Sequence, residues 1–239
     1  MKKYIFIFCI LGVVFGTYSF VDSASKSLRI VAIGDSITYG TGDPGKLGYV
    51  SRLQTDLEET LNVSIKVINF AVPKYTTEDI LKQLKDEDMR KKIRKADRLI
   101  LFVGTNDFRK SASYQFEPLN VRGITNGKGI YQDNLKQILE ILRKENNSAP
   151  IMVLGLFQPY VEFENNHAIQ EVIEDWNRGI ESVIQKFEYA YFVPTIDLFI
   201  GKQKEAYFSD SIHPNPNGYK LIAERIVNEL NRLEDTYTE

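Results

Sequence analysis

Short apolar runs alternate along this chain with longer segments in which apolar residues return at helical spacing. The runs hold six or seven residues and are rich in Ile, Val, Leu and Phe, which is typical of strands buried on both faces of a sheet. Apolar positions three or four residues apart indicate amphipathic helices between them. The predicted strands are 28–33, 65–70, 98–103, 151–157 and 191–196. The predicted helices are 49–61, 77–84, 131–144, 169–187 and 216–230.

This alternation predicts an α/β fold, a three-layer α/β/α sandwich around a central, mainly parallel five-stranded sheet. The last helix has a readable start, because Asn215 can cap it and Pro216 suits its first position. No internal repeat or low-complexity linker divides the chain. We therefore expect residues 26–239 to form a single domain.

Residues 1–25 have the pattern of a signal peptide or an N-terminal membrane anchor. Lys2 and Lys3 precede an apolar stretch over 4–21, and the small residues at 23–25 offer a cleavage site. Glycines and hydroxyl residues interrupt the stretch, which favours cleavage, with a retained anchor as the alternative. The only cysteine, Cys9, lies inside this segment. We expect an exported protein, secreted or at the cell surface, that folds without disulfides.

The composition fits one folded domain with a sizeable core. Hydrophobic residues make up 43% of the 239 positions, and 30 basic against 32 acidic residues leave a formal charge of -2. Since no basic stripe of the kind that a phosphate backbone requires is present, nucleic acid is not expected as a partner. Membrane contact is expected only through an uncleaved N-terminal segment.

Four short polar motifs carry the candidate chemistry, three of them at the ends of predicted strands. They are Gly34-Asp35-Ser36, Asn69, Gly104-Thr105-Asn106-Asp107 and Asp210-Ser211-Ile212-His213. The first places the hydroxyl of Ser36 directly after a strand, where it can act as a nucleophile. The last presents Asp210 beside His213, so that the carboxylate can orient an imidazole base. Each motif alone is also common as a turn or a helix cap.

A third motif adds stabilisation of negative charge. The amide of Asn106 can donate to the oxygen that becomes negative in a tetrahedral intermediate, with the backbone N–H groups of Ser36 and Ala71 as further donors. Because the carboxyl ends of parallel strands meet at one edge of the sheet, these groups are expected on one rim.

With these residues assembled, the chain resembles the SGNH hydrolases, also called GDSL-type esterases and lipases, over about 28–230. The resemblance implies a flavodoxin-like fold, Ser36 as nucleophile, His213 as base, Asp210 as its partner and Asn106 as an oxyanion donor. The second motif departs from the family, which usually has a glycine where this chain has Ala71 and often Ser-Gly at 73–74, here Pro73-Lys74. Since the donor would be a backbone N–H, alanine can still supply it.

Other motifs are read as structural. Residues 40–47 nearly spell a phosphate-binding loop, but Leu47 replaces the hydroxyl residue that would hold magnesium, which leaves a glycine-rich turn beside the site. Neither a Gly-x-Ser-x-Gly elbow nor a His-Glu-x-x-His pair occurs, and His167 has no matching acid, so it is interpreted as a surface residue. No cofactor and no metal are expected.

Two rim segments are candidates for substrate selection. Residues 108–129 carry Phe108, Tyr114 and Phe116 with three glycines, and are expected to form a long loop, either a lid or acyl-binding wall or an insertion without function. Residues 158–166 add Tyr160 and Phe163, which could also face the substrate.

These expectations converge on an exported serine esterase or lipase that forms an acyl-enzyme on small-molecule or lipid esters. Two alternatives stay open. One is an O-acetylesterase or acyltransferase acting on cell-wall or other polysaccharide through the same residues. The other is a binding protein that kept the fold without the reaction.

Overall fold

The computed structural model describes residues 27–236, which contain one five-stranded sheet. All of its strand pairs are parallel, in the order β2-β1-β3-β4-β5. The strands are β1 (Leu28–Gly34), β2 (Ile65–Asn69), β3 (Arg98–Phe102), β4 (Ile151–Leu154) and β5 (Ala190–Val193). The predicted α/β sandwich with a parallel five-stranded sheet is confirmed.

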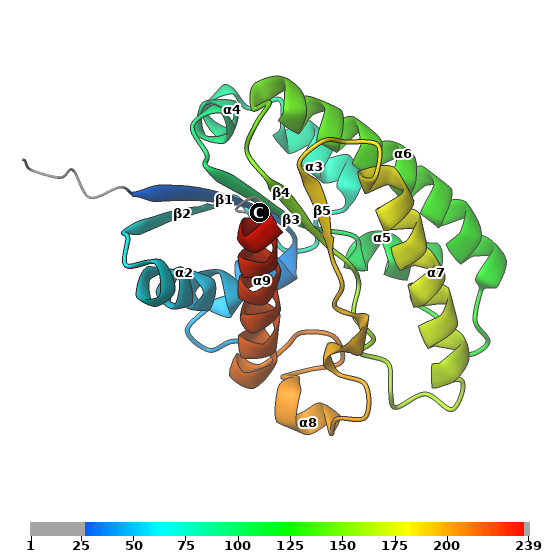
Figure 1. The fold of residues 1–239 in the computed structure, drawn as a ribbon. Helices are drawn as coiled ribbons and strands as arrows, with labels where there is room; N and C mark the ends of the chain where they lie inside the picture. Colours follow the sequence, from blue (N-terminus) through cyan, green and yellow to red (C-terminus); the bar gives the residue numbers. More distant parts are fainter. Residues whose placement is uncertain (1–26, 237–239) are drawn as a thin grey trace, which may run out of the picture.

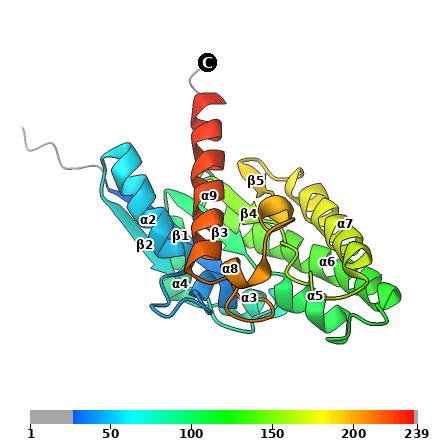
Figure 2. The ribbon, with the colours of Figure 1, turned by 90° about the horizontal axis from the view of Figure 1, so that it is seen from below.

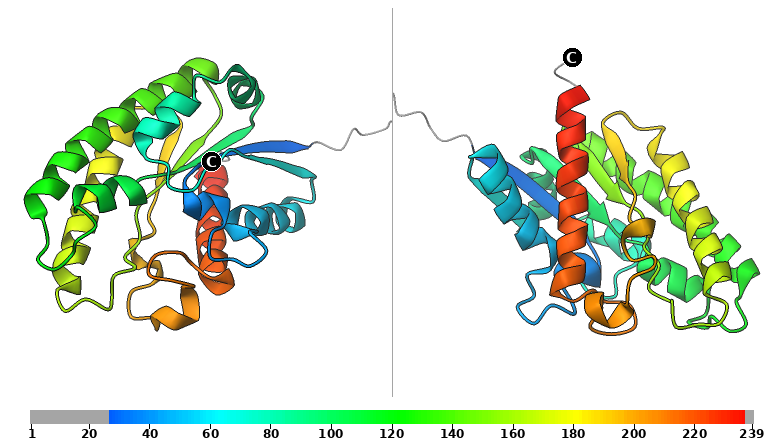
Figure 3. Two further views of the ribbon diagram at one scale, coloured as in Figure 1. Left: turned by 180° about the vertical axis from the view of Figure 1, so that it is seen from behind. Right: turned by 60° about the horizontal axis from the view of Figure 1, so that its bottom comes forward.

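Helices cover both faces of this sheet (Figures 1 and 3). One face carries α1 (Ser36–Tyr39), α2 (Gly48–Leu61) and α9 (Pro216–Thr236). The other carries α3 (Thr77–Gln83), α4 (Glu87–Arg94), α5 (Thr105–Ser111), α6 (Val121–Glu145) and α7 (Asn166–Ile184). A 3-10 turn, η1 (Ile196–Leu198), and the short α8 (Lys204–Tyr207) lie between β5 and α9.

Alternate side chains of each strand enter one of two hydrophobic cores. In β1, Val31 packs towards α3 to α7, whereas Ile30 packs towards α2 and α9, and both are fully buried. The same alternation holds for Leu101 and Phe102 in β3. Burial on both faces explains why the strands read as continuous apolar runs in the sequence.

The predicted helix starts are close to the observed ones, with one large exception. Asn215 caps α9 as expected, since its Oδ1 accepts from the backbone N–H of Asn217 at 2.9 Å and of Gly218 at 3.2 Å. The exception is α6, which was predicted over 131–144 and begins ten residues earlier, at Val121.

The expected long loop over 108–129 is therefore wrong. Most of it is helical, in α5 and the first turns of α6, and only 112–120 connects the two helices. Gly127 lies inside α6, where an added Cβ would come within 1.7 Å of Ser111 Oγ. This glycine serves the close approach of two helices instead of loosening a loop.

The aromatic residues of these segments face the core, with Tyr114 as the exposed exception. Phe108, Phe116 and Tyr160 are buried, and the rings of Phe116 and Tyr160 lie 4.2 Å apart between centroids. Phe108 also packs edge-on against Trp176 of α7, at 5.5 Å. The idea that Phe108 and Phe116 form a lid or an acyl-binding wall is not supported, because both rings are used in the core.

The predicted signal peptide or anchor at 1–25 lies outside the described residues. Within 27–236, no helix is both long enough and apolar enough to cross a membrane.

Candidate active site

Three of the four predicted motifs leave neighbouring strands at one edge of the sheet. The chain runs from β1 out to β2 on one side and returns to β3 on the other, so the strand order reverses between β1 and β3. In open parallel sheets, ligands bind outside the carboxyl ends of the strands at such a switch point. Ser36 follows β1 and Asn106 follows β3, and Figure 2 views the molecule from the side on which α8 and these connections lie.

The nucleophile candidate sits at the first position of α1. Asp35 caps this short helix, with its Oδ1 accepting from the Ile37 N–H at 2.9 Å, and Gly40 ends it at a φ of 91°. Such a one-turn helix holds the Ser36 hydroxyl at the sheet edge. The backbone N–H of Ser36 points to no protein acceptor among the described residues, as expected for the first turn of a helix.

The last motif reaches Ser36 from 177 positions away in sequence. His213 Nε2 lies 2.9 Å from Ser36 Oγ, and His213 Nδ1 lies 2.7 Å from Asp210 Oδ2. Asp210 Oδ1 also accepts from the backbone N–H groups of Ile212 and His213, at 2.9 and 2.8 Å. Although burial alone would raise the pKa of Asp210, these hydrogen bonds lower it overall, so the carboxylate stays ionised at neutral pH.

The glycine-rich turn at 40–47 supports the histidine. Gly42 has a φ of 94°, and an added Cβ there would lie 2.5 Å from the Pro214 carbonyl oxygen and 2.9 Å from His213 Cβ. Ser209 Oγ donates to the Gly42 carbonyl. The structure thus places this turn beside the site, as predicted.

Asn106 contributes its side-chain amide to the same rim. Its Nδ2 donates to the Tyr75 carbonyl at 3.0 Å and lies 3.4 Å from Asp35 Oδ2. The sequence pattern singled out Asn106 but gave no sign of either partner, because they lie 31 and 71 positions away.

The geometry around Ala71 differs from what an oxyanion donor needs. Its backbone N–H donates to Asn69 Oδ1 at 2.9 Å, and the Asn69 amide in turn donates to the Thr38 carbonyl at 2.9 Å. The Asn69 side chain therefore connects the loop that follows β2 to α1, the helix that carries Ser36. Lys74, three residues later, has a φ of 72°, and its N–H has no acceptor among residues 27–236.

A buried carboxyl group, Asp35, and a half-buried one, Asp107, lie beside the site motifs. Asp35 is 1% exposed, and desolvation raises its pKa to about 7, helped by the nearby charge of Asp107. Burial also raises the pKa of Asp107, against the hydrogen bonds that Thr77 donates through its N–H and hydroxyl. Both carboxyls belong to the sequence motifs, yet nothing in those motifs indicates that Asp35 is buried or that the pKa of either carboxyl is raised.

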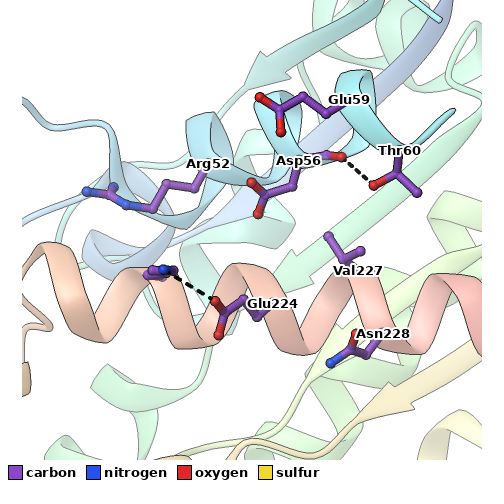
Figure 4. A pocket seen from close by; sticks show the side chains of 8 residues that line it. Arg52, Asp56, Glu59, Thr60, Glu224, Val227 and Asn228 are labelled. Atoms are coloured by element: carbon purple, nitrogen blue, oxygen red, sulfur yellow. Dashed lines mark hydrogen bonds and ion pairs between the residues drawn. The ribbon is translucent and has the colours of Figure 1, made fainter. Parts of the chain in front are cut away.

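The remaining candidates lie elsewhere. His167 is exposed on α7, as predicted. Within the described part of the chain, no three His, Cys, Asp or Glu residues cluster in a way that could hold a metal ion. A cavity of about 560 Å³ between α2 and α9 is lined by charged and polar side chains and by Val227, and no member of the Ser–His–Asp set borders it (Figure 4).

The fold and the site together define a class, an α/β protein with a serine, a histidine and an aspartate joined by hydrogen bonds at the carboxyl edge of a parallel sheet. Within that class, the chain belongs to the GDSL-like Lipase/Acylhydrolase family, whose model matches residues 32–221. The matched segment includes Ser36, Asn106, Asp210 and His213. Membership supports an ester hydrolase.

Two named relatives match this chain over most of its length. The uncharacterized protein YpmR of Bacillus subtilis is 31% identical over 211 residues, which cover 87% of this chain and 83% of that protein. The spore germination lipase LipC of Bacillus licheniformis is 26% identical, with 84% and 95% covered.

Solved structures show the same fold. The lipase Lip_vut3 from a goat rumen metagenome has a TM-score of 0.75 at 25% identity, covering 84% of this chain and 96% of that one. A catalytic mutant of Axe2, an acetylxylan esterase from Geobacillus stearothermophilus, has a TM-score of 0.66 at 18% identity, with 84% and 93% covered.

Proposed function

We propose that this protein hydrolyses carboxylic esters through an acyl-enzyme on Ser36. One observation carries the proposal: His213 lies within hydrogen-bond distance of both Ser36 Oγ and Asp210 Oδ2, at 2.9 and 2.7 Å. A nucleophile, a base and a group that orients the base are the parts that such a reaction requires.

In the first half of the reaction, Ser36 Oγ attacks the ester carbonyl carbon while His213 Nε2 takes the hydroxyl proton. Asp210 holds the Nδ1–H tautomer and stabilises the imidazolium that forms. Collapse of the tetrahedral intermediate breaks the bond to the alcohol, which leaves with the proton from His213. In the second half, water attacks the acyl-serine with His213 again as base, and the acid is released.

The negative oxygen of each intermediate needs preorganised donors. The free N–H of Ser36 and the amide of Asn106 support two of them. For the third, Ala71 would first have to leave Asn69, whereas the N–H of Lys74 is unengaged in the loop whose Tyr75 carbonyl binds Asn106. We therefore propose Lys74 as the loop donor in place of Ala71.

The substrate class remains a choice between two kinds of ester. The lipase relatives LipC and Lip_vut3 favour a lipid or other small-molecule ester. The fold shared with an acetylxylan esterase favours an acetylated carbohydrate as the second candidate. A panel of p-nitrophenyl esters of rising chain length, beside acetylated xylo-oligosaccharides and lysophospholipids, separates the two. A clear preference for acetyl groups on sugars would reject the lipid reading.

We also propose that the enzyme acts outside the cytoplasm, after loss of residues 1–25. Intact-mass measurement of the protein recovered from the culture medium and from the membrane fraction tests this. Recovery of the uncleaved chain from the membrane alone would replace secretion by anchoring.

Labelling with a fluorophosphonate probe tests the proposed mechanism. We expect the unaltered protein to be labelled and S36A to lose both labelling and ester hydrolysis, because the probe reacts with an activated serine. The control is S148A, which removes an exposed serine hydroxyl away from the site. Labelling of S36A at the rate of the control would refute Ser36 as nucleophile.

A further inference from the structure

Asp35 is a buried carboxyl whose full set of contacts the proposed mechanism does not use. An N-cap needs one acceptor oxygen, and Asn or Ser caps a helix about as well as Asp. Here Oδ1 alone accepts from Ile37, while Oδ2 lies 3.4 Å from Asn106 Nδ2. Burying a carboxyl group is costly, so a cap alone does not account for the second oxygen.

Among residues 27–236, no cation forms an ion pair with this carboxyl. The groups that face it electrostatically from α5, α2, α6 and α9 are Asp107, Tyr49, Tyr131 and Tyr219. All four are acids or phenols. The imidazole of His213 contacts the neighbouring residue, Ser36, at 2.9 Å.

The Asn106 amide has two hydrogens and two acceptors. The Tyr75 carbonyl takes one at 3.0 Å, which leaves the other on the side of Asp35 Oδ2 at 3.4 Å. A separation of 3.4 Å makes a weak hydrogen bond, so this hydrogen is oriented by the carboxylate yet remains available to a developing oxyanion.

We propose that Asp35 is a positioning residue of the oxyanion hole, with Oδ2 orienting the Asn106 amide while Oδ1 holds the helix that carries Ser36. One buried group thereby fixes the nucleophile relative to a charge-stabilising donor from another strand. The proposal rests on the proposed hydrolase function. It also gives the pKa of about 7 a consequence, because only the ionised carboxylate presents two acceptors.

A double-mutant cycle tests this coupling. D35N and D35S each keep an acceptor for Ile37 but lose the carboxylate opposite Asn106, and we expect kcat to fall about tenfold with KM within about twofold. In an N106A background, the same changes should lower kcat less than about twofold, since the amide to be oriented is gone. D86N is the matched control, because Asp86 caps α4 through Met89 and is remote from the site.

The acid limb of the kcat profile gives a second readout. The enzyme with ionised Asp35 should turn over about tenfold faster than the enzyme with protonated Asp35, so kcat of the unaltered enzyme should show one additional tenfold step as the pH falls. D35N should lack this additional step, a change that a merely structural role would not cause.

Two results would overturn the positioning role of Asp35 while leaving the hydrolase mechanism intact. One is that the losses of kcat in D35N and N106A multiply in the double variant, and the other is that D35N is as fast as the unaltered enzyme. S36A is measured in the same series. If S36A retained full activity, the hydrolase mechanism and this proposal would both fall.

Discussion

Replacing Asp35 by Asn should make the folded protein increasingly more stable, relative to the unaltered protein, as the pH rises from 4 to 8. The carboxyl is 1% exposed, and burial raises its pKa from 3.8 to about 7. Between these values the folded chain holds a proton that the unfolded chain has released. The free energy of unfolding therefore decreases as pH rises through this window, and the stabilisation present below pH 4 is lost above pH 7.

The magnitude follows from the two pKa values. Each tenfold difference in proton affinity corresponds to about 1.4 kcal/mol. The raised pKa of Asp35 therefore costs about 1 kcal/mol of stability at pH 4.5, where the folded chain keeps the proton, and about 4 kcal/mol at pH 8.5, where the buried carboxyl is ionised. Asn cannot ionise and carries no such cost. The free energy of unfolding of D35N, relative to that of the unaltered protein, should therefore be about 3 kcal/mol higher at pH 8.5 than at pH 4.5. Any effect of the changed contacts that does not depend on pH cancels from this comparison.

Urea unfolding of both proteins at pH 4.5, 6.5 and 8.5 measures this difference. D86N, which removes an exposed carboxylate from a helix cap, is the control for the loss of one negative charge. A stability difference between D35N and the unaltered protein that does not change with pH would refute a buried, proton-holding Asp35.

Three further outcomes are expected. N106A should lower kcat about 100-fold, a loss of about 3 kcal/mol in transition-state stabilisation measured with p-nitrophenyl acetate, and an unchanged kcat would remove Asn106 from the oxyanion hole. D210N should lower kcat about 10³- to 10⁴-fold without changing the fold by circular dichroism, since the wrong His213 tautomer is then favoured; a loss below tenfold would contradict this. G127A should lower the free energy of unfolding by about 1–3 kcal/mol, because its Cβ would meet Ser111, whereas G129A has open space and should be neutral or stabilising by urea titration.

The strands could be predicted because a strand that is buried on both faces of the sheet consists of a continuous run of apolar residues, which is visible in the sequence. The helices that the sequence pattern does not predict lack an equally clear recurrence of apolar residues. In α4 only Met89 and Ile93 are buried, so its charged sequence hides the helical period. In α6 the glycines were read as loop residues since glycine disfavours helices, while Gly127 is needed where α5 comes close.

The candidate site divides in the same way. Asp210 and His213 are three residues apart, so one turn brings them together and the sequence shows their relation. The contact of Asp35 with Asn106 joins two strands and spans 71 positions, and the bond from Ala71 to Asn69 depends on the path of one loop. Such relations depend on how the segments pack in three dimensions.

The position of Asp35 at the switch point of the sheet explains why the same residue is proposed to support catalysis and lowers the stability of the fold when it is ionised. The carboxyl edge between β1 and β3 brings α1 and α5 together with strands already packed on both faces, so a side chain that links them is buried. Burial makes Asp35 costly when ionised and, for the same reason, strengthens its hold on Asn106, because electrostatic interactions gain strength as water is excluded. A D35N variant that is both more stable above pH 7 and slower in catalysis would show the two effects in one molecule. A variant that is more stable and equally fast would mean that the carboxylate of Asp35 lowers stability without contributing to catalysis.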